Sequence, residues 1–77
     1  MPVAIMLIDC SIGTDDVVID RLKKIPAVAY AYKLIGYHDI ILKVESNSAE
    51  ELRKTISHKI RTLDNILSTI TMVVLEK

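Results

Sequence analysis

The chain has 77 residues, and its ten Lys and Arg are balanced by ten Asp and Glu, so its formal net charge is zero. Hydrophobic residues make up 51% of it, and they are almost all aliphatic, because there is no Phe or Trp and only three Tyr. This length allows one small domain, over residues 1–77. The apolar content and the neutral charge exclude intrinsic disorder, and they count against direct binding of nucleic acid, which usually needs a basic excess. No apolar run is long enough for a membrane-spanning helix.

One cysteine, Cys10, cannot form an internal disulfide, and no Cys and His residues have the spacing of a metal site. The first residues lack the basic segment of a secretory signal. We therefore expect a cytoplasmic protein without a metal or another cofactor. A single core of this size supplies only a few kcal/mol of net stability, so we look for a surface that a second copy could bury.

The first predicted element is a strand from Val3 to Cys10, which is apolar on both faces and is therefore expected to be covered on both. A helix follows, with Thr14 as its N-cap. It ends before Pro26, because proline disfavours helical backbone in the residue before it. The apolar residues of this helix recur at helical spacing: Val18, Leu22 and Ile25.

Two strands are predicted next, from Ala27 to Ile35 and from Asp39 to Glu45, joined by the short turn Gly36-Tyr37-His38. In the second of these strands, apolar and polar residues alternate. In the first, strict alternation places Ala27, Ala29, Ala31, Lys33 and Ile35 on one face and the following residues on the other: Val28, Tyr30, Tyr32 and Leu34.

A second helix is predicted from Ser48 to Leu63, because Ser48 and Glu51 match a capping box. Its apolar stripe is Ala49, Leu52, Ile56, Ile60 and Leu63. The last strand, Ile66 to Leu75, is rich in β-branched residues and again apolar on both faces.

The order strand, helix, strand, strand, helix, strand is the ferredoxin-like, split βαβ arrangement of the α+β class. Right-handed crossovers place both helices on one face of a four-stranded antiparallel sheet. The other face would then expose a large apolar patch, which marks an interaction site. We therefore predict a homodimer in which the open faces pack on each other.

Signals of catalysis are weak, and we expect no catalytic residue. There is no nucleophile elbow, phosphate-binding loop or metal-ligand motif. His38 next to Asp39 could form an acid–base pair, but neighbouring strand residues point to opposite faces. RNA recognition on this fold uses aromatic residues on the central strands, and these strands have none.

The remaining candidate site combines the turn Gly36-Tyr37-His38-Asp39 with the stretch Thr69-Ile70-Thr71. A carboxylate can accept hydrogen bonds from an ammonium group, and exposed backbone N–H groups can hold a carboxylate. These are the requirements for binding a free amino acid. The alternative is that Asp39 caps its own turn, as Asp often does.

The residues from Val28 through the Gly-x-x-Asp turn, the helix Ser48 to Leu63 and the Thr-x-Thr strand that starts at Ser68 resemble the effector domain of the Lrp/AsnC transcription regulators, known as the RAM domain. The resemblance covers essentially the whole chain. It implies the split βαβ fold, dimers that pair through their sheets, higher even-numbered assemblies up to octamers, and amino-acid effectors bound between dimers. Carried over by position, the effector-binding residues are Gly36, Tyr37, His38, Asp39, Thr69, Thr71, Met72 and Val73.

Full-length regulators of this family begin with a helix-turn-helix DNA-binding domain, which has no counterpart in this sequence. We therefore expect a stand-alone RAM domain that does not bind DNA directly and that could join a full-length Lrp/AsnC regulator in a mixed assembly. Two alternatives stay open: a small dimeric α+β-barrel enzyme and an ACT-like regulatory domain.

Overall fold

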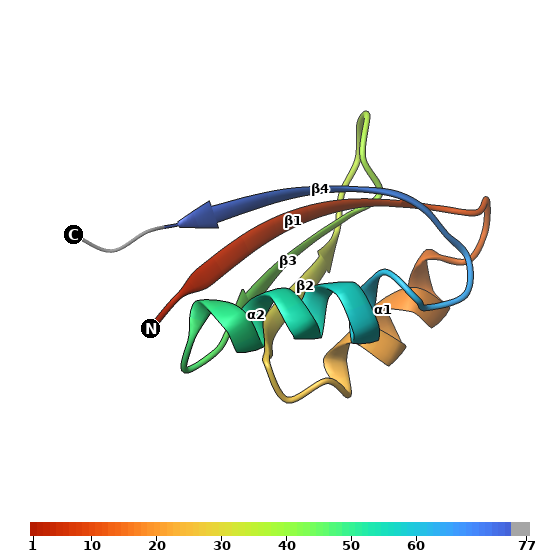
Figure 1. The fold of residues 1–77 in the computed structure, drawn as a ribbon. Helices are drawn as coiled ribbons and strands as arrows, with labels where there is room; N and C mark the ends of the chain where they lie inside the picture. Colours follow the sequence, from red (N-terminus) through yellow and green to blue (C-terminus); the bar gives the residue numbers. More distant parts are fainter. Residues whose placement is uncertain (75–77) are drawn as a thin grey trace.

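The computed structural model describes residues 1–74 as one antiparallel sheet with two helices on one of its faces (Figure 1). The strand order is β2-β3-β1-β4, which is that of the predicted ferredoxin-like fold. The elements, in chain order, are β1 (Val3–Cys10), α1 (Asp15–Lys23), β2 (Val28–Lys33), β3 (Ile40–Glu45), α2 (Ala49–Thr55), the π-helical turn η1 (Ile56–Ile60) and β4 (Ile66–Val74).

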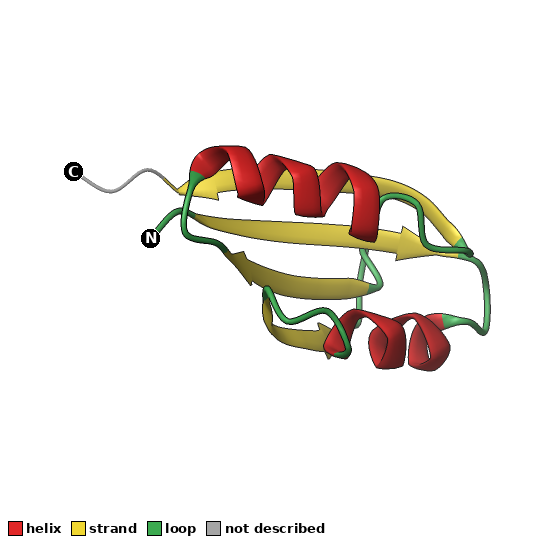
Figure 2. Ribbon diagram, turned by 60° about the horizontal axis from the view of Figure 1, so that its bottom comes forward, coloured by secondary structure: helices red, strands yellow, loops and turns green. Residues whose placement is uncertain are grey.

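Figure 2 shows α1 lying over the β2 side of the sheet and α2 lying over β1 and β4. The other face of the sheet carries no helix, as predicted. The predicted bounds of β1 are confirmed, whereas β2 and β3 are shorter than predicted, because residues 34–39 form the connecting hairpin. The predicted last residue of β4, Leu75, lies outside the described residues.

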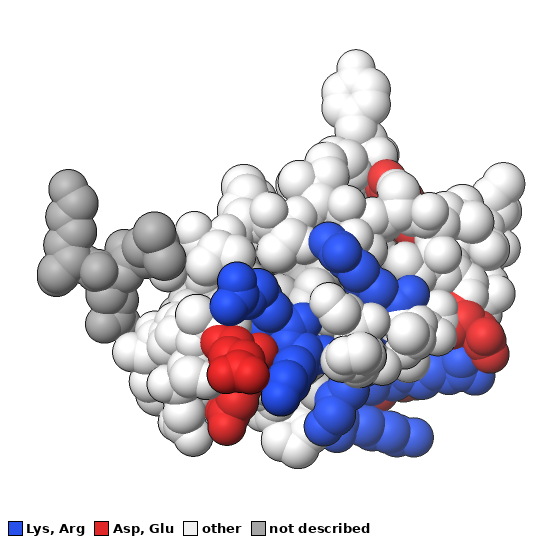
Figure 3. Space-filling view, in the orientation of Figure 1, with Lys and Arg blue, Asp and Glu red and all other residues white. Residues whose placement is uncertain are grey.

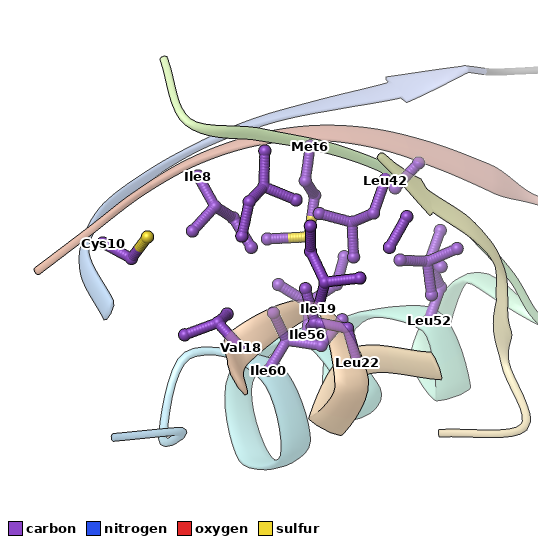
Figure 4. Packing of buried hydrophobic residues seen from close by; sticks show 14 residues of the cluster. Met6, Ile8, Cys10, Val18, Ile19, Leu22, Leu42, Leu52, Ile56 and Ile60 are labelled. Atoms are coloured by element: carbon purple, nitrogen blue, oxygen red, sulfur yellow. The ribbon is translucent and has the colours of Figure 1, made fainter. Parts of the chain in front are cut away.

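The core forms where alternate residues of β1 and β3 meet the apolar stripes of the helices (Figure 4). Met6, Ile8 and Leu42 point down from the strands toward the helices, and each is completely buried. From the helices, Val18, Ile19, Leu22, Leu52, Ile56 and Ile60 point back at them. The predicted helix stripes are therefore confirmed, except that Ala49 is exposed.

Strand β2 departs from the strict alternation predicted for it. Its register with β3 shifts between Val28 and Tyr30, so that Val28 lies opposite Val44 and faces the helices. A bulge of this kind inserts one unpaired residue and exchanges the faces of the residues on either side of it. The prediction that Val28 shares a face with Tyr30 and Tyr32 is therefore wrong; the two tyrosines stack on the open face with their ring centroids 5.2 Å apart.

The two helices begin differently. Ser48 caps α2, because its hydroxyl accepts a hydrogen bond from the backbone N–H of Glu51 at 3.1 Å. Thr14 precedes α1 as predicted, but its hydroxyl donates to the carbonyl of Ser11 at 2.7 Å and makes no capping bond. The prediction of a capping side chain at Thr14 is therefore wrong, although the position of the helix start is right.

The second helix continues from α2 into η1, where the backbone N–H of Arg61 donates to the carbonyl of Ile56 at 2.9 Å, an i to i+5 bond. The sequence spaces Leu52, Ile56 and Ile60 four residues apart, which drifts around a regular helix of 3.6 residues per turn. A wider turn reduces that drift, and all three side chains are buried. Within residues 1–74, no helix is long and apolar enough to cross a membrane.

Their burial predicts that two leucines of the sheet contribute very differently to the free energy of unfolding. Leu42 is completely buried, whereas Leu67 is 70% exposed. Leu42→Ala should lower the free energy of unfolding by about 2–5 kcal/mol, the usual cost of removing a buried leucine side chain. Leu67→Ala should change it by less than about 0.5 kcal/mol. Urea unfolding at matched protein concentration measures both, and equal losses would contradict the assignment of the core.

Candidate functional site

The β2–β3 hairpin, residues 34–39, rises from the sheet on the side opposite the helices (Figure 1). It is closed by a 2.8 Å hydrogen bond from the N–H of Leu34 to the carbonyl of Asp39. Gly36 has φ 138°, a backbone conformation that side chains rarely adopt, so glycine is required at the tip. Ile35 and Tyr37 are fully exposed on either side of it.

Asp39 ties the base of the hairpin to the end of β1. Its Oδ2 accepts a hydrogen bond from the backbone N–H of Cys10 at 2.9 Å, and its own N–H donates to the carbonyl of Ile8 at 3.1 Å. The carboxylate therefore accepts a hydrogen bond from a neighbouring strand. The alternative left open by the sequence was that it caps its own turn. Burial raises the pKa of the Cys10 thiol, and the nearby Asp39 and Asp15 carboxylates add to the rise, so Cys10 is an unreactive core residue.

A second polar cluster lies at the same end of the open face. The Nδ1 atom of His38 is 3.2 Å from Oδ1 of Asp9, and the hydroxyl of Ser68 donates to Oδ2 of Asp9 at 2.8 Å. The carboxylate of Asp9 thus joins the hairpin, β1 and β4. The hydrogen bond from Ser68 and the contact with His38 hold the pKa of Asp9 below its ordinary value of 3.8, against a smaller opposing effect of desolvation.

The sequence did not identify Asp9 or Ser68 as site residues, and it placed His38 in the candidate site without a partner for its side chain. The signal that could have found the cluster is Asp9 itself, the one charged residue of an otherwise apolar strand. His38 and Asp39 do point in different directions, as predicted, since they contact Asp9 and Cys10 separately.

The predicted site residues of β4 lie on both faces of this strand. Thr69, Thr71 and Val73 pair with β1 residues that face the helices, whereas Met72 is opposite Ile5 on the open face. The hydroxyl oxygen of Thr71 is buried and has no hydrogen-bond partner among residues 1–74.

Within residues 1–74, the predicted site residues of the hairpin and those of β4 do not lie together. Ile8 pairs with Ile40 on one side and with Thr69 on the other, so the base of the hairpin and Thr69 are separated by β1, about 10 Å for two strand spacings. Met72 and Val73 lie farther along β4, another 10 Å or more at about 3.3 Å per residue.

Asp39 also lines a small hollow of about 210 Å³ next to the loop after β1, which it shares with Cys10, Ser11, Ile12, Gly13 and Asp15. Two carboxylates on this hollow favour a cationic group over an anionic one. In the part of the chain that the structure describes, no group of three His, Cys, Asp or Glu is placed to hold a metal ion.

The order of the elements and the order of the strands are those of the ligand-binding domain of a class of transcription regulators. The model of the Lrp/AsnC ligand binding domain family matches residues 3–77, and the chain belongs to this family.

Three comparisons show how the chain relates to known members. It is 37% identical over 60 residues to an uncharacterized HTH-type transcriptional regulator of Pyrococcus furiosus, PF0250, covering 78% of this chain and 40% of that protein. It superposes on the crystal structure of the hypothetical protein PHS023 from Pyrococcus horikoshii with a TM-score of 0.95 and 32% identity, covering 100% of this chain and 93% of the other. The structure of Escherichia coli AsnC gives a TM-score of 0.89 and 28% identity, covering 99% of this chain and 52% of AsnC. The chain thus spans about two-fifths of its curated relative's length.

The Asp9 cluster predicts a specific acid sensitivity. A carboxylate whose pKa is lower in the folded state stabilises the fold above its unfolded pKa, and this contribution is lost as the pH falls below about 4. Ser68→Ala should raise the pKa of Asp9 toward 3.8, because the hydroxyl donor is removed. NMR titration of the carboxyl carbon measures this shift. Ser57→Ala on the exposed side of η1 is the control and should leave the Asp9 titration unchanged.

Proposed function

We propose that this chain is a non-enzymatic module that binds an amino-acid effector and assembles through its open sheet face, in the regulation of transcription in the cytoplasm. The observation that carries the proposal is the combination of an uncovered apolar face with a polar hairpin at its margin. Family membership supports the regulatory role, since the matched family is a ligand-binding domain of transcription regulators.

The open face supports assembly with a second copy. Ile70, Met72 and Val74 of β4 are each about half exposed, at 47–49%, and Tyr32 is 62% exposed. The three β4 residues continue the row formed by Val3, Ile5 and Leu7, which pair with them across the sheet, and Tyr32 lies opposite Ile41 of β3. A contiguous apolar surface of this kind marks an interface. An identical face on a second copy matches its shape and its apolar character, and a two-fold pair is the commonest arrangement.

The proposed effector residues are Gly36, Tyr37, His38 and Asp39 of the hairpin with Thr69, Thr71, Met72 and Val73 of β4. Oδ2 of Asp39 accepts from the N–H of Cys10, and Oδ1 makes no hydrogen bond to the backbone of residues 1–74, so it can accept one from an ammonium group. The N–H groups of residues 36–38 donate to no acceptor in the same part of the chain, so they can hold a carboxylate.

Because the hairpin and the end of β4 are far apart in one chain, we propose that the effector binds where the hairpin of one dimer meets β4 of another. Even-numbered assemblies up to an octamer would create such contacts, and a full-length Lrp/AsnC regulator could take the place of one partner.

The alternative of a small dimeric enzyme gains no support from the histidines. His58 is exposed, and His38 has its Nδ1 atom against Asp9 at the surface, so neither is a buried base. The alternative of an ACT-like domain shares the fold and the ligand class, but the family match is to the Lrp/AsnC domain.

An amino-acid screen tests the effector proposal. In a thermal-shift assay against the twenty amino acids, at least one should raise the melting temperature, by several degrees at about 100 times its Kd. Asp39→Asn should abolish that rise, because it removes the charge while keeping an oxygen that can accept from Cys10. Asp20→Asn, an exposed carboxylate on α1, is the control and should keep it. Failure of every amino acid to stabilise the protein would refute the effector proposal.

A charged substitution tests the assembly proposal. Ile70→Glu places a carboxylate in the open face, where burial against a second copy would desolvate it. The dissociation constant of the dimer should therefore rise at least about tenfold. Val17→Glu on α1 is the matched control, since Val17 is 49% exposed and Ile70 is 47% exposed. Native mass spectrometry and light scattering measure the populations. A wild-type protein that is monomeric at micromolar concentration would contradict the assembly proposal.

A further inference from the structure

A hollow of about 600 Å³ lies on the helix side of the molecule, at the opposite end of β3 from the hairpin. Its volume is within the range of about 300–1,000 Å³ that is usual for small-molecule sites. One wall is the segment Ile25, Pro26 and Ala27 between α1 and β2, and the other is formed by α2 and η1. Since the hollow is on the covered side of the sheet, a second copy on the open face would leave it accessible.

The wall formed by α2 and η1 is polar along its length, while the wall opposite is apolar. Its polar side chains follow one another down the helix: Glu51, Lys54, Thr55, His58 and Lys59. In Figure 3, red side chains lie over the N-terminal end of α2 and blue ones lie beside and beyond them, whereas the upper side of the molecule is almost entirely white.

The residues of this row recur at i, i+3, i+4, i+7 and i+8, which is one face of a helix, and the π turn brings its two ends closer to one direction. In a regular α-helix, two residues that are eight apart differ in direction by about 80°. The turn η1 takes up one extra residue, which rotates Lys59 back toward the face of Glu51.

Two charges on the hollow are left without an ion pair. Glu45 is 3.1 Å from Lys43, and Lys54 is 3.6 Å from Glu50, so these two lining residues already have partners. Glu51 and Lys59 make no ion pair among residues 1–74. Eight residues separate them along the helix, about 12 Å at 1.5 Å per residue. The hollow is therefore negative at one end, positive at the other and apolar along one wall.

We propose that this hollow binds a short, linear zwitterion of the size of a tripeptide, with its ammonium group on Glu51, its carboxylate on Lys59 and His58, and its body against Ile25, Pro26 and Ala27. An extended chain of three residues spans about 10–11 Å, close to the rise of about 12 Å along the helix from Glu51 to Lys59. A free amino acid does not fit both ends, because its two charged groups are held about 2.5 Å apart across N–Cα–C. The ligand class therefore differs from that of the proposed effector site.

Titration of the full chain with trialanine tests this inference by NMR. The backbone amides of Ala27, Thr55 and Lys59 should shift in a saturable manner, and those of the hairpin should not. Free alanine at the same concentration should not shift the resonances of these amides, because it is too short to reach both charged residues. Trialanine that is acetylated at its N-terminus and amidated at its C-terminus should bind at least about threefold more weakly, since both charge contacts are lost.

Two substitutions test which residues bind the two ends of the peptide. Glu51→Gln and Lys59→Met should each weaken trialanine binding about threefold to fivefold, as expected for a partly exposed charge pair. Lys23→Met, an exposed lysine on α1 outside the hollow, is the matched control and should not change it. Equal binding of the charged and capped peptides, shifts at the hairpin instead of the hollow, or no saturable shift with trialanine would each overturn the proposal.

Discussion

The structure depends on one constraint: the sheet is apolar on both faces, and two short helices can cover only one of them. Burial along β1 alternates between complete and partial, because one set of residues meets the helices and the other faces outward. The outward set, Val3, Ile5 and Leu7, is no more polar than the buried set. The hydrophobic effect that forms the core therefore acts on the outer face as well, and this is the physical basis of the assembly proposed above.

The polar residues at the hairpin end mark where that apolar face stops. Asp9 occupies a position that would extend the outward row of β1, but it is held by Ser68 and His38 at the margin of the sheet. A carboxylate buried against a partner would lose its hydration, so this cluster limits how far a second copy can overlap the first. The same residues that shape the candidate site thereby restrict the geometry of assembly.

The fold could be predicted from the sequence, because period-two strands, two amphipathic stripes and the capping serine Ser48 all indicate the same topology. The exceptions are local backbone events. The bulge near Ala29 reverses the face of Val28, and alternation alone contains no signal for it. The π turn η1 was also missed, although the four-residue spacing of Leu52, Ile56 and Ile60 is a hint of it.

The candidate site was less predictable than the fold, because its contacts join residues distant in sequence. Asp39 was identified from its turn, but its partner, the N–H of Cys10, is 29 positions away. Ser68 and Asp9 are 59 positions apart and meet only because β4 pairs with β1. Sequence reasoning placed the hairpin correctly and could not know which strand ends it would touch.

Strand β4 has one further consequence. It is at the edge of the sheet, nine residues long, and it contains neither proline nor any charged residue. Edge strands in most proteins carry such residues as protection against adding another chain by backbone hydrogen bonding. Here the only such device within Ile66–Val74 is the irregular pairing next to Asp9 and Cys10 at the start of the strand, so the outer edge of the rest of β4 is a template for extending the sheet. The proposed assembly would have to cover this edge as well as the open face, and a chain kept from assembling would be prone to aggregation through it.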